Sequence, residues 1–167
     1  MPAGPNHKLS DPMIPPNLDI SSIEDASTLE FDDAEEERET RALMNRAEAF
    51  LRSFSWCSGI KETYLGIVVP GVLGVFLFHI SPATTEVDEY LWVVVGDLPP
   101  AYLVTDDAPN PSSALTNYVA EMRTWVDAVR RGDSTDGLIP VNAPATLDSA
   151  NELASRLDFL TERILKE

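Results

Sequence analysis

The sequence predicts an α+β fold: a meander of three or four antiparallel strands, over about residues 61–104, packed against three helices. Three observations support this fold class. Residues 64–104 are rich in apolar, β-branched and aromatic side chains and contain nine of the thirteen valines of the chain. Turn-forming Pro and Gly residues divide that stretch into pieces of strand length. The segments on either side instead repeat apolar residues every three or four positions, which is the helical period.

The first segment, residues 1–30, is interpreted as a leader that precedes a single domain over 31–167. Its five prolines lie between Pro2 and Pro16 and prevent a regular helix there, because proline removes a backbone donor. Its apolar residues are scattered without a helical or strand period. We therefore expect this acidic, Pro-rich leader to be either disordered or an extended arm that lies over the domain.

The first helix is predicted over about 33–57. Asp32 or Asp33 can cap its start, and three glutamates follow in the first turn, where the helix dipole favours negative charge. Ser58-Gly59 supplies a stop signal at its end. The apolar face of this helix is expected to consist of Leu43, Ala47, Phe50, Leu51 and Phe54.

The strands follow in quick succession. Pro70-Gly71 suits a type II turn, since proline fixes a negative φ and glycine accepts the positive φ that comes next. Connections this short require antiparallel neighbours, because a parallel crossover needs about a dozen residues or more. The strands are expected over 61–69, 72–80, 88–96 and 101–104, with a tight corner at 96–100.

Both faces of the two middle strands are apolar. A half-solvated antiparallel sheet alternates apolar with polar residues, and neither 72–80 nor 88–96 shows that alternation. We expect helices to cover one face of the sheet. The second face then needs another cover, for which the leader, a further helix and a second copy of the chain are the alternatives.

Two helices complete the predicted fold. The first, over about 111–131, has Asn110 as its cap, a proline in its first turn and Gly132 at its end. The second, over about 147–165, can be capped by Thr146 and has a leucine-rich stripe along one face. A loop of Gly, Asp, Ser, Pro and Asn joins them.

The chain is acidic, with 28 Asp and Glu against 12 Lys and Arg, which gives a formal net charge of −16. Residues 1–40 contain eleven acidic residues against Lys8 and Arg38, so this quarter of the chain contributes −9 of the total. Such a charge repels nucleic acid and anionic membrane surfaces and attracts basic proteins. We therefore expect a protein partner of basic character, and neither nucleic acid nor a membrane.

A cytoplasmic location is expected. The single cysteine, Cys57, permits no internal disulfide, which suits a reducing compartment. The beginning of the chain lacks the positive charge and the apolar core of a signal peptide. Residues 64–80 contain no charged side chain, but Pro70-Gly71 at their middle favours a hairpin over a membrane-spanning helix.

No stretch of the sequence indicates a particular reaction. Two histidines and one cysteine are too few for the usual zinc patterns, and no phosphate loop, dinucleotide fingerprint or nucleophile elbow is present. We predict no catalytic residue, no metal and no cofactor. Asp97, in the corner before two prolines, is interpreted as a turn former whose carboxylate accepts backbone N–H groups, with a functional acid as the alternative.

The function that fits best is a non-catalytic protein-binding module, a class that by analogy includes immunity proteins, antitoxins and secretion chaperones. Trp92 and Tyr90 share one strand face and belong either to the core or to an interface, where amphipathic rings are favoured. The candidate binding residues are Tyr90, Trp92, Asp97 and Tyr102. The alternatives are an enzyme with a carboxylate and aromatic pocket, built on Asp97 and His79, and a homodimeric structural subunit.

Overall fold

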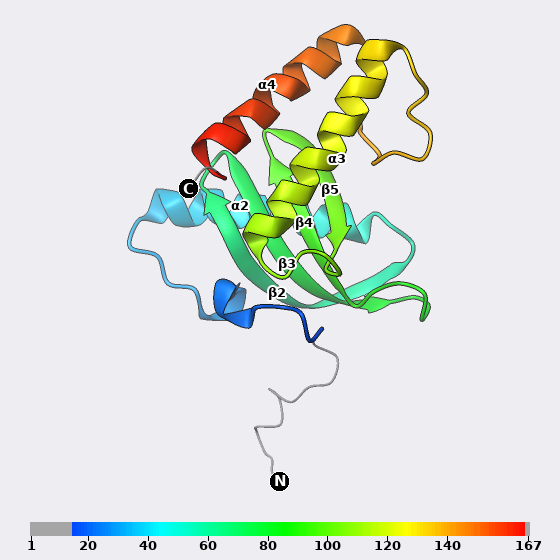
Figure 1. Ribbon diagram of the computed structural model, residues 1–167. Helices are drawn as coiled ribbons and strands as arrows, with labels where there is room; N and C mark the ends of the chain where they lie inside the picture. Colours follow the sequence, from blue (N-terminus) through cyan, green and yellow to red (C-terminus); the bar gives the residue numbers. More distant parts are fainter. Residues whose placement is uncertain (1–14, 166–167) are drawn as a thin grey trace.

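A five-stranded sheet lies between two helical layers in the computed structural model, which describes residues 15–165 (Figure 1). The strands follow chain order across the sheet, and each pair of neighbours is antiparallel. The strands are β1 (Glu24–Asp25), β2 (Cys57–Val69), β3 (Leu73–Pro82), β4 (Tyr90–Gly96) and β5 (Leu98–Val104). The α+β class and the antiparallel meander are thus confirmed, with five strands in place of the predicted three or four.

The long helices begin at the predicted caps, each of which accepts a hydrogen bond from a backbone N–H in the first turn: Asp33, Asn110 and Thr146. No helix within residues 15–165 is long and apolar enough to cross a membrane. The helices are α2 (Ala34–Arg52), α3 (Pro111–Arg131) and α4 (Leu147–Arg163), preceded by the short 3-10 turns η1 (Ile20–Ser22) and η2 (Ala26–Thr28). The last helix ends slightly before the predicted residue 165.

The predicted end of the first helix, at residue 57, is wrong. Helix α2 stops at Arg52, and the Ser53 hydroxyl donates to a carbonyl of its last turn at 2.6 Å. Phe54 keeps the helical spacing in the sequence, but its ring stacks on Trp56 in the turn that follows. The chain therefore reverses earlier than expected, and Ser58-Gly59, the expected stop signal, lies inside β2.

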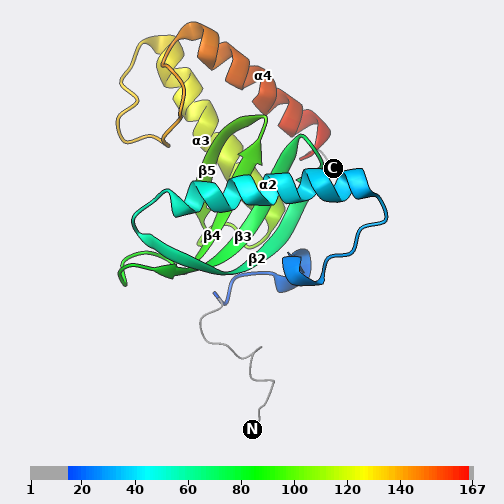
Figure 2. The ribbon, with the colours of Figure 1, turned by 180° about the vertical axis from the view of Figure 1, so that it is seen from behind.

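Helices cover both faces of the sheet, so the second face needs neither the leader nor a second copy of the chain as its main cover. Helix α2 crosses the face seen in Figure 2, and α3 crosses the opposite face, with α4 packed against α3 (Figures 1 and 2). On the α2 side lie Phe76, Phe78, Ile80, Leu91, Val93 and Val95. On the α3 side lie Leu73, Val75, Leu77, Tyr90, Trp92 and Val94. The two helical layers explain why both strand faces are apolar.

Residues 15–30 run from the C-terminal end of β5, where the Asp19 N–H donates to the Pro109 carbonyl at 2.8 Å, to the outer edge of β2, where β1 adds a short fifth strand. Leu18 is buried in the core on the α3 side of the sheet. The Asn17 side chain donates to the Thr105 carbonyl at 2.7 Å, which fastens this segment to the end of β5. This part of the predicted leader thus lies on the domain, while residues 1–14 lie outside the described residues.

Two turns meet at one end of the sheet. The predicted turn at Pro70-Gly71 is present, with Gly71 at φ 78° and the Val72 N–H donating to the Val69 carbonyl at 2.9 Å. The corner between β4 and β5 rests against this turn, because the Asp97 N–H donates to the Val72 carbonyl at 3.0 Å. Gly96 precedes it at φ 147°, and a side chain there would overlap the Val72 carbonyl oxygen. This contact requires glycine.

Candidate functional site

The outer edge of β5 is the least protected edge of the sheet. Strand β4 pairs with one side of β5, and within residues 15–165 no backbone hydrogen bond joins residues 101–104 to any other element. No charged side chain lies between Leu98 and Val104. Tyr102 and Val104 are 36% and 46% exposed, although both are large and apolar. Apolar side chains therefore line an open strand edge, which is a template for pairing with another chain.

Tyr102 belongs to an aromatic cluster that consists of Phe50, Phe54, Trp56 and Tyr102. Phe54 and Trp56 are stacked, with ring centroids 4.8 Å apart. Tyr102 meets Trp56 at 5.0 Å and Phe54 at 5.3 Å, both edge to face. Phe50 completes the cluster at 5.2 Å from Phe54. Each of the four side chains keeps part of its surface in water, so the cluster forms a patch beside the strand edge.

Separate segments of the chain build this aromatic cluster. One ring comes from α2, two come from the turn after it, and Tyr102 comes from β5. Tyr102 faces α2 because it lies opposite Val93, whose side chain is buried on that side of the sheet. The Ala83 N–H donates to the Trp56 carbonyl at 2.8 Å, which ties the turn to the connection between β3 and β4.

An acidic groove lies on the opposite face of the same strand edge. It encloses about 470 Å³ between β5, α3 and residues 137–139 of the loop before α4. Tyr102, Leu103 and Val104 line the groove from the strand, with Leu103 packed on the α3 side of the sheet, and Asp107 and Glu121 supply two carboxylates. No Lys or Arg is among its lining residues. One face of the β5 edge is therefore aromatic, and the other is acidic.

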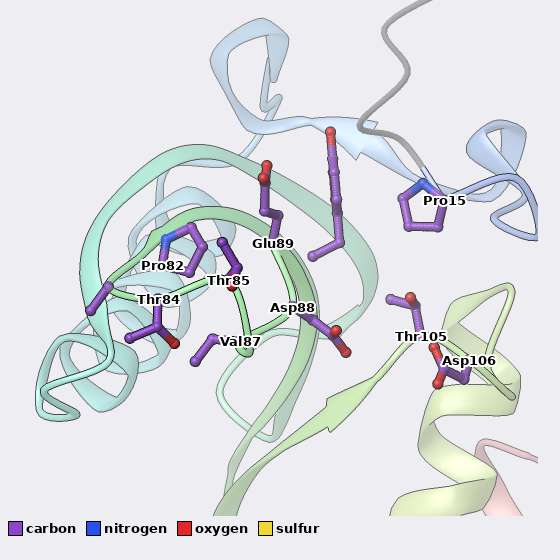
Figure 3. Close-up of a pocket in the computed structure, with 11 residues that line it drawn as sticks. Pro15, Pro82, Thr84, Thr85, Val87, Asp88, Glu89, Thr105 and Asp106 are labelled. Atoms are coloured by element: carbon purple, nitrogen blue, oxygen red, sulfur yellow. The ribbon is translucent and has the colours of Figure 1, made fainter.

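A larger pocket, of about 670 Å³, opens where the β3–β4 connection meets the C-terminal end of β5 (Figure 3). Asp88 and Glu89 lie on that connection, and Thr105 and Asp106 lie across the pocket from them. The lining residues include no Lys or Arg. Positive charge is therefore favoured at this end of β5 as well.

His79 is buried beside this pocket and contacts two of its lining residues, Glu89 and Tyr90. Its Nε2 lies 3.2 Å from a Glu89 oxygen, its Nδ1 lies 3.4 Å from a Glu62 oxygen, and its ring stacks on Tyr90 with centroids 4.3 Å apart. The Tyr64 hydroxyl donates to Glu62 at 2.7 Å. Burial, and then this hydrogen bond, raise the pKa of Tyr64 above its usual range. Since carboxylates engage both imidazole nitrogens, His79 links three segments of the sheet and presents neither nitrogen to the pocket.

The four predicted binding residues do not form one site. Tyr90 and Trp92 are only 4% and 0% exposed, so the structure places Trp92 in the core, which is one of the two alternatives that its sequence position allows. Asp97 lies at the opposite end of β5 from the pocket, and its carboxylate pairs with Arg156 at 3.4 Å. Within residues 15–165 that carboxylate accepts no backbone N–H, which corrects the expectation for its turn. Tyr102 is the member that lies in the aromatic cluster.

The two residues of the enzyme alternative are also far apart. His79 pairs with Tyr90 at the start of β4, whereas Asp97 follows the end of that seven-residue strand. At about 3.3 Å per residue, roughly 23 Å separates them, so they do not share a pocket. Within the described part of the chain, no group of three or more His, Cys, Asp or Glu side chains is arranged to hold a metal ion.

Sequence reasoning missed Phe50, Phe54 and Trp56 as residues of a site. Their spacing assigns the two phenylalanines to the buried face of a helix, and no local pattern places Trp56 beside Tyr102. The signal that was present is the gathering of three aromatic residues within seven positions where a helix ends. Aromatic side chains, Tyr and Trp above all, are enriched at protein interfaces.

The chain matches no protein-family model, no curated protein and no solved structure. The β5 edge combines partly exposed aromatic rings, an open strand edge and two acidic hollows. This edge is the candidate functional site.

Proposed function

We propose that this protein is a non-catalytic binding module that holds another protein at the outer edge of β5. The observation that supports the proposal most strongly is the aromatic cluster, in which four partly exposed rings adjoin an open strand edge. Aromatic side chains supply much of the energy at protein interfaces, because they bury a large area at a small entropic cost. Apolar patches that stay exposed in the free protein mark sites where a partner binds.

The partner that suits this edge is basic. The acidic groove and the pocket at the end of β5 contribute five carboxylates between them, and neither has a Lys or Arg in its lining. The net charge of −16 adds a long-range attraction for positively charged proteins. Affinity should fall as salt is added, because at 0.1 M ionic strength exposed charges are screened over about 10 Å.

The proposal includes a cytoplasmic location and one copy of the chain at the interface. Cys57 is free and buried, which suits a reducing compartment. The homodimer alternative depends on a sheet face without a cover, and helices occupy both faces of the sheet. A self-associating edge would also bring two strongly acidic chains together.

Quantitative affinity capture from the cells that naturally express the protein tests this function. The baits are the wild-type chain, a Trp56→Ala/Tyr102→Ala variant, and a Phe159→Ala control that removes an exposed aromatic side chain from α4. We expect at least one protein that binds the wild-type and control baits and is depleted at least about tenfold on the cluster variant. Its capture should also weaken at high salt.

The outcome that contradicts the proposed function is equal capture of every bound protein by all three baits. Circular dichroism of the cluster variant accompanies the capture, so that loss of binding is read only from a folded bait. A more conservative Trp56→Phe/Tyr102→Phe variant keeps the rings and should restore most of the capture.

A further inference from the structure

We propose that the partner binds as an added strand on β5, through an extended segment in which apolar and basic residues alternate. This inference rests on the proposed function and specifies how the partner is held. Strand addition uses the unpaired backbone groups of an edge strand for affinity. Side-chain positions on the two faces of the added strand then supply specificity. An exposed aromatic patch by itself would require neither an extended partner nor this alternation.

The edge of β5, and not that of β2, is the one open to pairing. The outer side of β2 carries β1, and its register with β3 shifts at three places. Such irregularities twist an edge away from new partners. Lys61 and Glu62 add charges to β2, which also oppose pairing. In contrast, residues 101–104 of β5 lie in regular register opposite residues 91–94 and carry no charge.

The two faces of β5 favour different side chains on an added strand. Tyr102 and Val104 face α2 and are partly exposed beside the aromatic cluster. Leu103 faces α3, where the acidic groove contains Asp107 and Glu121. Side chains of an added strand alternate between the same two faces. Apolar residues are therefore favoured on the α2 side and Lys or Arg on the α3 side, in strict alternation.

The open stretch of β5 is short. Pro99-Pro100 has no backbone N–H to donate to an added strand, and the Tyr118 hydroxyl already donates to a carbonyl of this pair. At the other end, the Asn17 side chain donates to the Thr105 carbonyl at 2.7 Å. Residues 101–104 remain, which is about 13 Å of strand. The paired part of the partner is therefore about four residues long.

A basic segment of a different protein suits this edge better than a second copy of the chain. Pairing β5 with the β5 of another copy brings together two chains of charge −16. It also places the carboxylates of Asp107 and Glu121 from both copies near one interface. Like charges across an interface oppose association, whereas lysine or arginine side chains in the groove are attracted by it. We therefore assign the edge to a heterologous basic segment.

Fluorescence anisotropy with labelled synthetic peptides tests this mode of binding. The first probe is a peptide of about nine residues in which lysine and valine alternate. A second peptide has the same composition with lysines and valines in adjacent pairs, and a third replaces each lysine by glutamate. We expect the alternating lysine peptide to bind at least about tenfold more tightly than either of the others. Methylation of the backbone nitrogens along its pairing edge should remove that binding.

Charge-reversal variants locate the bound peptide. In Asp107→Lys/Glu121→Lys the groove becomes basic, and we expect the order of the lysine and glutamate peptides to reverse. Asp127→Lys/Glu162→Lys makes the same change in net charge at exposed positions outside the groove, and should keep the wild-type order. Val104→Lys places a charge on the α2 side of the edge, where the wild-type side chain is 46% exposed, so the fold should tolerate it. It should weaken the alternating lysine peptide at least about tenfold.

Strand addition at β5 is overturned if no peptide binds, if the alternating and paired peptides bind equally, or if the order reverses in the control variant. It is also overturned if light scattering shows a wild-type dimer that Val104→Lys converts to a monomer. The peptide results leave the proposed function standing, provided that capture still depends on Trp56 and Tyr102, whereas a dimer formed through β5 also overturns its assignment of one copy of the chain to the interface. Capture that is independent of those two residues overturns the proposed function, whatever the peptides do.

Discussion

The ring of Trp56 meets the ring of Tyr102 edge to face, with centroids 5.0 Å apart and planes at 69°. Trp56 lies in the turn between α2 and β2, while Tyr102 lies on the last strand of the sheet. Their contact joins the start of the meander to its end through side chains. The aromatic surface beside the β5 edge is therefore a product of the tertiary fold and should be lost with it.

A double-mutant cycle on this pair measures how far the contact stabilises the fold. We expect Trp56→Ala and Tyr102→Ala to couple by about 1 kcal/mol in the free energy of unfolding, which is usual for an aromatic pair. Urea unfolding of the wild type, both single variants and the double variant gives this coupling. Phe159→Ala, on α4 at the other face of the sheet, should add to Tyr102→Ala without coupling. A coupling below about 0.3 kcal/mol would show that the two rings do not stabilise each other.

Trp92 is predicted to support stability rather than binding. Its side chain is fully buried, and Nε1 donates to the Ala108 carbonyl at 2.9 Å. Trp92→Phe leaves that buried carbonyl without this donor and removes volume, so we expect the free energy of unfolding to fall by about 2–4 kcal/mol. The same substitution at the partly exposed Trp56 should cost less than about 1 kcal/mol. Equal losses at the two positions, measured by urea unfolding, would speak against a core role for Trp92.

Two glycines with positive φ are predicted to respond differently to alanine. Gly96→Ala forces a Cβ into the Val72 carbonyl, so we expect it to lower the free energy of unfolding by more than about 3 kcal/mol. Gly132 ends α3 at φ 77°, and a Cβ added there would meet no other atom within 4 Å. Gly132→Ala should therefore cost only the left-handed backbone penalty of about 1–2 kcal/mol. Thermal and urea unfolding of both variants gives the comparison. Equal losses would mean that the corner between β4 and β5 can open to admit a side chain.

Alkaline pH should destabilise the fold through two tyrosines. Burial raises the pKa of Tyr118, and burial followed by the hydrogen bond to Glu62 raises the pKa of Tyr64, both well above the usual value of about 10. The folded protein therefore holds these protons more tightly than the unfolded chain does. The contribution of these two tyrosines to the free energy of unfolding is fully present below about pH 10. It falls as the pH rises further, by up to about 1.4 kcal/mol per pH unit for Tyr118.

Unfolding by urea between pH 8 and 12 checks this dependence. Tyr118→Phe loses the hydrogen bond to the Pro99 carbonyl, so near pH 8 it should be less stable than the wild type by about 1 kcal/mol. Above about pH 10, its stability should fall less steeply than that of the wild type, because one of the two titrating groups is gone. Parallel curves above that pH would contradict the role given to Tyr118.

The sequence predicts an element of this fold well when the residues that determine it lie within the element itself. Helix α3 is predicted at both ends, because Asn110 and Gly132 mark its limits within the segment itself. The end of α2 is predicted too late, since Phe54 continues the helical spacing while its ring belongs to a contact with β5. Strand β1 is missed because two residues hold no strand pattern and depend on pairing with β2.

The candidate site is predicted only in part, for a related reason. Tyr102 is identified from the sequence, but its aromatic neighbours come from a segment much earlier in the chain, and no local pattern brings the two together. Tyr90 and Trp92 have the same amphipathic rings, yet α3 covers them. Sequence periodicity shows that both faces of the sheet need cover, but it does not show which helix covers which face.

Hydrogen exchange at residues 101–104 is the most direct test of a partner-binding edge on β5. Amide exchange is measured by NMR for the wild-type chain, with and without a saturating concentration of the alternating lysine and valine peptide. The proposal predicts that exchange slows at least about tenfold at alternate amides within 101–104 and is unchanged along the outer edge of β2. Bound peptide with unchanged exchange in residues 101–104, or with protection confined to β2, would contradict it.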